Sequence, residues 1–232
     1  MDNRVVVGIH QPNFMPWLGY FYKIWQSDIF IFLDDVQFIK TGSNYTNRVT
    51  INISGKNKYF TVPIKRGHGI QQIDETIFLN EKWKKKFAST LQANYAKSPF
   101  FNTNRELIFE LINFNATTLS DYNINFIETI SQQLNLNTKF IRSSKFQIKT
   151  KSTQRLIELI KKVDGDIYLS GEGGDEYQEH NLYQKANIEV AYNIMPSFKY
   201  TQPKTEEFIS GLSVVDAIFN MGFENLKSHL FK

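Results

Sequence analysis

The sequence contains no cysteine, no long apolar run and no strong excess of charge. Without a thiol, disulfides, thiolate catalysis and cysteine-based zinc sites are excluded outright. No uninterrupted apolar segment approaches the roughly 20 residues that a membrane helix needs, and no basic segment precedes an apolar signal core at the N-terminus. These absences predict a cytoplasmic protein from a reducing compartment, with no membrane insertion.

The charge distribution and the spacing of the histidines exclude further classes of functional site. The net charge is only +4, and lysines and arginines are spread over the whole length. The one dense run, Lys82 with Lys84-Lys85-Lys86, is interpreted as a solvated helix face, so nucleic acid is not expected as a partner. No histidine pair has the spacing of zinc ligands and no serine sits in a nucleophile elbow. We therefore assign no metal-ligating residue.

The beginning of the chain predicts the start of a parallel sheet. With 232 residues, of which 41% are hydrophobic, the chain can bury one substantial core. Val5–Ile9 and Ile29–Leu33 read as buried strands. Trp17–Gln26, entered at Pro16, reads as a helix whose apolar face is expected to contain Leu18, Phe21, Tyr22 and Trp25. Such a strand–helix–strand unit seeds a parallel sheet.

The later elements complete an α/β pattern. Two alternating runs around Ser54-Gly55-Lys56-Asn57 predict an antiparallel hairpin, Arg48–Ile53 with Lys58–Ile64. The other predicted elements are helices over Glu81–Ala96, Asn104–Asn115, Leu119–Leu134, Thr153–Val163 and Ser213–Met221, and strands over Lys139–Arg142, Asp166–Leu169 and Glu189–Tyr192. The expected fold class is α/β: a Rossmann-like, mainly parallel sheet with a β-hairpin and a helical segment. We expect residues 1–232 to form a single domain with a helical subregion at about 81–134.

Polar residues follow the first strand directly. Ligands of open α/β sheets collect at the carboxyl ends of the strands, where His10 and Gln11 are followed by Asn13 and Trp17. The His10 imidazole can act as an acid or base near neutral pH, or donate a hydrogen bond to phosphate. The alternative is a turn histidine that ties down its own loop. The amides and the indole beside it favour a functional role.

The second strand ends in paired carboxylates. Asp34 or Asp35 can orient His10, bind a ribose hydroxyl or hold Mg²⁺ through water. The competing interpretation is that acidic residues simply cap the end of a strand. Because neighbouring parallel strands end at the same edge, we expect both acids to lie near His10. Gln37 follows them closely.

Two further segments carry candidate binding residues. Asn47 and Arg48 precede the hairpin, and an arginine can grip phosphate in bidentate fashion, although a surface salt bridge fits the pattern equally well. Ser143-Ser144 and Arg155 can reach a nucleotide or be ordinary turn and surface residues. The last segment is a loop after a strand, whose candidate residues are Gly171, Gly173, Gly174 and Tyr177.

The glycines of that last loop allow a tight turn that presents backbone N–H groups to an anion. A tight turn with no ligand is the competing interpretation. Glu172, Asp175 and Glu176 lie in the same loop, so it suits a sugar, an amine or a metal-bridged phosphate better than a bare phosphate.

Several of these strings resemble the WbqC-like protein family. The most specific are His10-Gln11-Pro12-Asn13-Phe14-Met15-Pro16-Trp17-Leu18-Gly19 and Leu33-Asp34-Asp35-Val36-Gln37-Phe38. The softer ones are Asn47-Arg48, Thr61-Val62-Pro63, Asn94-Tyr95-Ala96-Lys97-Ser98-Pro99-Phe100, Tyr168-Leu169-Ser170-Gly171, Gly173-Gly174, Tyr177, and Tyr200 with Gln202. The resemblance covers nearly the whole chain.

The resemblance implies a role in making an unusual sugar for bacterial surface polysaccharides such as O-antigen. It suggests a transferase that forms an N-acyl or aminoacyl amide, such as a glycyl amide, on a nucleotide-linked amino sugar. The alternatives are a non-catalytic sugar-nucleotide-binding or assembly protein and an ATP-using nucleotidyltransferase or ligase. The architecture is similar to that of nucleotidylyltransferases and pantothenate synthetase, but Gly19 and Tyr20 stand where those enzymes have a second histidine.

For the transferase, the residues suggest a division of roles. His10 is the candidate base, oriented by Asp34 or Asp35. Gln11, Asn13 or backbone N–H groups near Gly171 would stabilise the oxyanion. Arg48 would hold the diphosphate of a nucleotide-sugar substrate, and Trp17 or Tyr177 would stack on a ring. The donor is left open between ATP with Mg²⁺ and acyl-CoA, and so is the oligomeric state.

Overall fold

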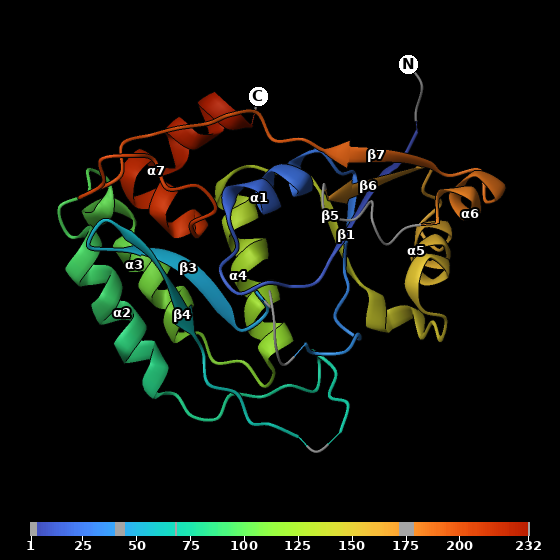
Figure 1. Cartoon of the computed structure of the whole chain (residues 1–232), viewed down its shortest axis with the longest axis horizontal. Helices are drawn as coiled ribbons and strands as arrows, with labels where there is room; N and C mark the ends of the chain where they lie inside the picture. The colour runs from blue at the N-terminus through green and yellow to red at the C-terminus, as the bar shows by residue number, and fades with distance from the viewer. Residues whose placement is uncertain (1–3, 40–44, 68, 172–178, 232) are drawn as a thin grey trace. The chain divides into compact units, whose positions relative to one another are not determined.

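The computed structural model describes residues 4–39, 45–67, 69–171 and 179–231 (Figure 1). The chain divides into two compact units that are interleaved in the sequence. Unit 1 comprises Met1–Gln11, Gly19–Asp35 and Leu136–Pro196, and unit 2 comprises Pro12–Leu18, Val36–Asn135 and Ser197–Lys232. The expectation of a single domain over residues 1–232 stays a prediction.

Unit 1 is built on a five-stranded sheet of order β5-β2-β1-β6-β7, in which every neighbouring pair is parallel. The strands are β1 (Val6–His10), β2 (Ile29–Phe32), β5 (Lys139–Arg142), β6 (Ile167–Gly171) and β7 (Glu189–Asn193). The chain adds strands on one side of β1 and then returns to add β6 and β7 on the other. This confirms the expected α/β class with a mainly parallel sheet. It also places a topological switch point between β1 and β6.

Helices cover both faces of this sheet. On one face Val7 and Ile9 pack with residues of α5 (Ser152–Lys161) and α6 (His180–Lys185), which lie side by side in Figure 1. On the other face α1 (Leu18–Trp25) approaches closely, and its Tyr20 packs on Phe30 of β2 with the ring centroids 5.5 Å apart. A short 3₁₀ helix, η1 (Ser143–Phe146), follows β5.

Gly8 is the reason α1 can lie so close to β1. A Cβ atom at Gly8 would come within 2.4 Å of Ser27 Oγ and 2.9 Å of the Phe30 ring. The Ser27 hydroxyl donates to the Lys23 carbonyl at 2.8 Å, so the end of α1 is fixed at this contact. A glycine at this position of the strand therefore sets the distance between α1 and the first strand.

We expect Gly8→Ala to lower the free energy of unfolding by about 1–3 kcal/mol, because the added methyl group has no space between the strand and α1. Urea denaturation of both proteins measures this. Gly171→Ala is the matched control, because a Cβ atom there meets nothing within 4 Å. Equal stability of the two variants would contradict the proposed close packing.

The buried face predicted for α1 from the sequence is only partly correct. Leu18 and Phe21 are buried as expected, but Tyr22 and Trp25 are only partly buried. The remaining buried residues of the helix are Tyr20, Lys23 and Ile24. The buried face of the helix is therefore centred on Tyr20, Phe21 and Ile24, and it includes a lysine.

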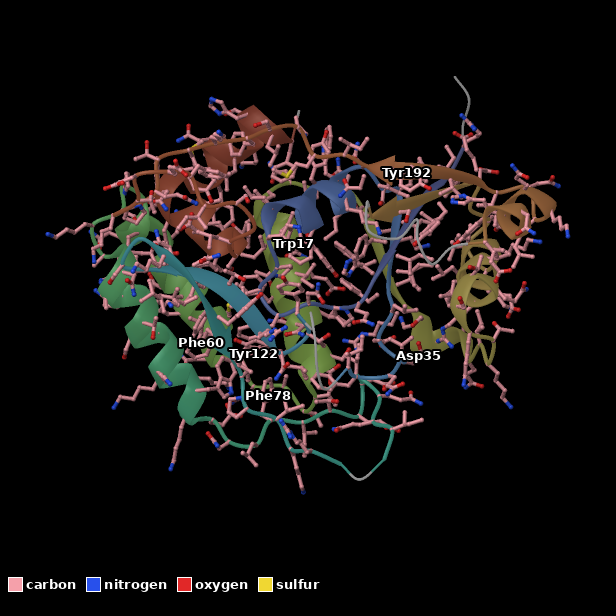
Figure 2. All side chains as sticks on the ribbon, in the orientation of Figure 1. Trp17, Asp35, Phe60, Phe78, Tyr122 and Tyr192 are labelled. Atoms are coloured by element: carbon pink, nitrogen blue, oxygen red, sulfur yellow. The ribbon has the colours of Figure 1, made fainter. Side chains whose placement is uncertain are left out.

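Unit 2 combines the hairpin with the helical segment. Its elements are β3 (Arg48–Ile53), β4 (Lys56–Thr61), α2 (Lys82–Tyr95), α3 (Phe101–Asn113), α4 (Leu119–Gln133) and α7 (Val214–Leu230). Aromatic rings fill its interior, and Figure 2 shows Phe60, Phe78 and Tyr122 gathered there. Phe60 lies 4.4 Å from Phe87, and Phe78 lies 5.4 Å from Tyr122, measured between ring centroids. Most aromatic residues of the unit thus serve the core.

A buried polar network joins three segments of unit 2 around Asp216. Its carboxylate accepts hydrogen bonds from the hydroxyls of Tyr95 and Tyr200, both at 2.8 Å, and from the amide of Gln202 at 3.0 Å. Asp216 lies in the first turn of α7, which Ser213 caps. At Gly222, with φ 74°, the helical path is interrupted. This kink falls next to Met221, where the sequence placed the end of the helix.

Two details of unit 2 correct the sequence interpretation. Ser54 and Gly55 alone form the hairpin turn, both with positive φ, so Lys56 already pairs with Ile53. In the lysine run, Lys84 is buried and donates to the carbonyl of Phe114, whereas its lysine neighbours are exposed. Across the described ranges, no helix is both long enough and apolar enough to cross a lipid bilayer.

Candidate functional site

The candidate site of unit 1 lies at the carboxyl edge of its sheet. Because the strands are parallel, the residues that follow β1, β2, β5 and β6 gather at the same edge. His10 pairs with Phe32 at this edge, and its carbonyl accepts a hydrogen bond from Leu33 N–H at 2.8 Å. The structure therefore places His10 at the same rim as Asp34 and Asp35, which follow Leu33.

His10 is partly buried and held as one tautomer. Its Nδ1 lies 3.0 Å from the carbonyl oxygen of Gln11, and since a carbonyl only accepts, Nδ1 carries the proton. Tyr20 donates to the same carbonyl at 2.9 Å and packs edge-on against the imidazole ring. The lone pair is therefore on Nε2. Burial, together with the positive charge of Lys23, lowers the pKa of His10 from 6.5 to about 4.

Lys23 extends from α1 to the sheet beside His10. Its Nζ donates to the Ile9 carbonyl at 2.8 Å and lies 5.9 Å from the centroid of the Tyr168 ring on β6. The side chain is almost completely buried, and burial lowers the pKa of its amine from 10.5 to about 7. A basic group is thus placed between β1 and β6.

Asp34 is buried at the end of β2 and binds the segment after β5. Its Oδ1 accepts from the Ser144 backbone N–H at 3.0 Å, and its Oδ2 accepts from the Ser144 hydroxyl at 2.9 Å. The Ser143 hydroxyl lies 3.1 Å from Oδ1 and accepts from the Asp34 N–H at 3.2 Å. These contacts fix the carboxyl end of β2 to that of β5.

Asp35 is paired with Arg155 of α5. The guanidinium Nη2 lies 2.5 Å from Asp35 Oδ1, and Nη1 donates to the carbonyl of Ile148 at 2.6 Å. Ser143 forms a second short contact with the same carboxylate. Both side chains are largely buried, so the pair is desolvated and well ordered. Figure 2 shows Asp35 beside the segment that follows β5.

The carboxyl end of β6 lies on the other side of the switch point from β1. Ser170 is fully buried and its hydroxyl donates to the Gly171 carbonyl at 3.2 Å. Among the described residues, none comes within 4 Å of the position that a Cβ atom at Gly171 would take. The other predicted residues of this loop, Gly173, Gly174 and Tyr177, lie outside the described residues.

In unit 2, Trp17 and Arg48 meet at Tyr45. The Trp17 and Tyr45 rings lie 5.6 Å apart, and the Arg48 guanidinium lies 6.0 Å from Tyr45 and 4.6 Å from Tyr59. Tyr59 is 57% exposed. An arginine between two tyrosine rings offers both a charge and aromatic faces. Trp17 and Arg48 stay predicted binding residues.

The remaining predicted residues of unit 2 differ in accessibility. Asn13 is buried, and Gln37 is exposed in an isolated bridge with Gln72. The Asn47 side chain donates to the Val62 carbonyl at 2.9 Å and so holds the entry to the hairpin. This contact gives Asn47 a structural task in addition to its predicted role.

Lys23 is the residue of this edge that the sequence interpretation missed. Positions 20, 23, 24 and 27 share one face of a helix, and this face contains Tyr20, Lys23, Ile24 and Ser27. The signal was a lysine between buried residues of an otherwise apolar helix. Ser143, Ser144 and Arg155 had been left open between a binding role and ordinary surface roles, and here they bind the two aspartates.

Neither a metal cluster nor the unit 2 depression provides a competing site. Among the residues described, no group of three or more histidine, aspartate or glutamate side chains is placed to hold a metal ion. An open depression of about 490 Å³ in unit 2 is lined by residues of α2 and of the α3–α4 connection. Its Lys84 ammonium is already engaged by Glu81 and the Phe114 carbonyl. None of the predicted site residues lines this depression.

The lowered pKa of His10 predicts a loss of stability in acid. Between pH 6.5 and about 4 the unfolded chain binds a proton at His10 that the folded chain excludes, so stability falls as the pH falls. We expect this residue to contribute a loss of about 3 kcal/mol. The measurement is the difference in unfolding free energy between the wild type and His10→Asn, at pH 7 and pH 4. A difference that does not change with pH would contradict the assignment.

Comparison with known proteins identifies relatives along nearly the whole chain. The profile of the WbqC-like protein family matches residues 11–228. A protein of Mycobacterium tuberculosis (strain ATCC 25618 / H37Rv), described as "Uncharacterized protein Rv1507c", is 27% identical over 220 residues. The match covers 94% of this chain and 94% of that relative. No solved structure matches the chain.

Proposed function

The chain belongs to the WbqC-like protein family, and we propose that it is a transferase that forms an N-acyl or aminoacyl amide on a nucleotide-linked amino sugar of bacterial surface polysaccharide. The observation that carries this proposal is the carboxyl edge of unit 1. There His10, whose Nδ1 donates to the Gln11 carbonyl, stands at the rim of a doubly wound parallel sheet, next to its switch point. Nucleotides bind at such positions in many α/β proteins.

The proposed step is attack of the sugar amine on an acyl carbonyl carbon. A C–N bond forms, the bond from the acyl carbon to its leaving group breaks, and the amine loses a proton to His10 Nε2. Gln11 and the backbone around Gly171 are the proposed donors to the oxyanion. Because its pKa is about 4 in the free protein, His10 is neutral at pH 7. A bound phosphate would raise this pKa towards the pH range of efficient general bases.

The aspartates support this chemistry indirectly. Asp34 and Asp35 bind Ser143, Ser144 and Arg155, and these bonds hold the ends of β2 and β5 in register. We propose that the acids keep the rim rigid around His10, because a preorganised site needs supported side chains. ATP with Mg²⁺ and a thioester remain the two candidate sources of the activated acyl group.

The test is a turnover assay on the full chain. UDP-, GDP- and dTDP-linked amino sugars are incubated with acetyl-CoA, or with glycine, ATP and Mg²⁺, and the products are weighed by mass spectrometry. We expect the mass of one acyl or aminoacyl group to be added only when the protein is present. A shift in melting temperature without any product would instead support a non-catalytic sugar-nucleotide-binding protein. No shift and no product would refute both.

A further inference from the structure

Lys23 is an almost completely buried amine. Its side chain is 3% exposed, and its hydrogen bond goes to the neutral carbonyl of Ile9. Within the part of the chain that the structure describes, no carboxylate lies within ion-pair distance of its Nζ. Buried charges are ordinarily paired, because an isolated one is costly. A lysine at such a position indicates a functional role, because it does not contribute to stability.

The amine stands at the point where β1 and β6 separate. Their paired register ends at Gly8 and Leu169. Carbonyls alternate in direction along a strand, so the Ile9 carbonyl points to the β6 side, as that of Val5 does when it accepts from Ile167 N–H. Lys23 Nζ therefore occupies the place of the next ladder bond. It lies where the pairing between the two strands ends.

The described residues for which an interaction with this amine is seen are basic or neutral. His10 of β1 lies close enough for the two positive charges to oppose each other, and Tyr168 of β6 presents its ring. α1 itself carries no other charged residue. Positive charge at a switch point attracts anions, and a low dielectric strengthens that attraction. Among the described residues, none supplies a negative charge to this amine, so an anionic ligand is the counter-charge that we consider.

We propose that Lys23 is a binding residue for phosphate, and that its ammonium attracts the diphosphate of the nucleotide-linked substrate to the gap between the carboxyl ends of β1 and β6. The identity of the substrate rests on the proposed function, whereas the attraction of an anion rests on Lys23 alone. Because burial lowers the pKa of Lys23 to about 7, an anion bound there favours the protonated form. Binding is then strongest below this pH.

The test compares charged and uncharged probes by isothermal titration calorimetry at pH 6.5. UDP and inorganic pyrophosphate carry the phosphates, and uridine lacks them. We expect Lys23→Met to weaken UDP and pyrophosphate binding at least ~10-fold and to change uridine binding less than ~2-fold. Lys161→Met, which removes an exposed lysine of α5, should change neither. Equal weakening of UDP and uridine, or no binding of UDP and pyrophosphate to the wild type, would overturn the proposal.

A second variant separates charge from shape. Lys23→Arg keeps its charge at all relevant pH values. Between pH 6.5 and 8.5 the wild type should lose UDP affinity relative to Lys23→Arg, since the titration of UDP itself is common to both. If the ratio of the two UDP affinities stayed constant over this pH range, the proposal would be contradicted. Lys23→Met should unfold at a temperature no lower than the wild type at pH 7, because it removes a buried charge.

The two proposals can fail separately. If UDP binding depends on Lys23 and no amide forms with any donor, the phosphate site stands and the transferase proposal falls. If amide forms and Lys23→Met binds UDP as the wild type does, the reverse holds.

Discussion

His10→Ala is expected to lower the rate of amide formation by roughly 10²–10⁴-fold and to leave the affinity for the nucleotide sugar nearly unchanged. The reason is the position of the imidazole. Its Nδ1 donates to the Gln11 carbonyl, so Nε2 carries the lone pair that is proposed to take the proton of the attacking amine. Removal of a general base affects the transition state much more than the bound ground state.

The measurement is steady-state kinetics with the nucleotide sugar found in the turnover assay, together with its dissociation constant. His229→Ala is the matched control, since His229 is an exposed histidine of α7 whose ring bonds the Asn225 carbonyl of its own helix. The control should retain the wild-type rate. Full activity of His10→Ala, or a loss of affinity that accounts for the whole effect, would remove His10 from the role of base.

Asp34→Ala is expected to lower the free energy of unfolding by about 3–5 kcal/mol. Asp34 is 1% exposed, and its carboxylate accepts from the backbone N–H and the hydroxyl of Ser144. The substitution leaves these buried donors without an acceptor. It also releases the end of β2 from the end of β5.

Chemical denaturation at neutral pH checks this expectation, and Asp34→Asn provides the comparison. The amide keeps one acceptor oxygen and nearly the same shape, so the loss of stability should be clearly smaller. Ser144→Ala removes the hydroxyl alone and should cost about 1 kcal/mol. If Asp34→Ala were as stable as the wild type, the carboxylate would not hold the two strand ends together. Asp34 would then be examined for a role in the proposed reaction instead.

The sheet of unit 1 was predictable because its signals are local. Val5–Ile9 and Ile29–Leu33 are short apolar runs that end in polar residues, and β1 and β2 fall there. Lys139–Arg142 coincides with β5. The position of His10 beside Asp34 and Asp35 at one edge follows from parallel pairing alone, as the structure confirms.

The partners of those residues were not predictable, because they come from distant parts of the chain. Asp34 and Ser143 are 109 positions apart in the sequence, and Asp35 and Arg155 are 120 apart. A single sequence carries no signal for such pairs. Lys23 was missed for a different reason. Helical periodicity gave α1 an apolar face on Tyr22 and Trp25, but in the structure Tyr20 and Lys23 are the buried residues.

Short elements were also missed. The six residues of α6 carry too little periodicity to be recognised as a helix. The strand β4 begins earlier than expected, because two residues of positive φ, Ser54 and Gly55, are sufficient to reverse the chain. Tertiary contacts determine that α6 forms, and turn geometry determines where β4 begins.

The insertion of Val36–Asn135 between β2 and β5 has a consequence for biosynthesis. As the chain leaves the ribosome, β1 and β2 emerge early, but the strands that flank them, β5 and β6, follow only after more than one hundred further residues. Until then both outer edges of the nascent β1–β2 pair expose free N–H and C=O groups. Such edges invite pairing with other chains. Pairing with β5 and β6 closes both edges only after the inserted segment has been synthesised.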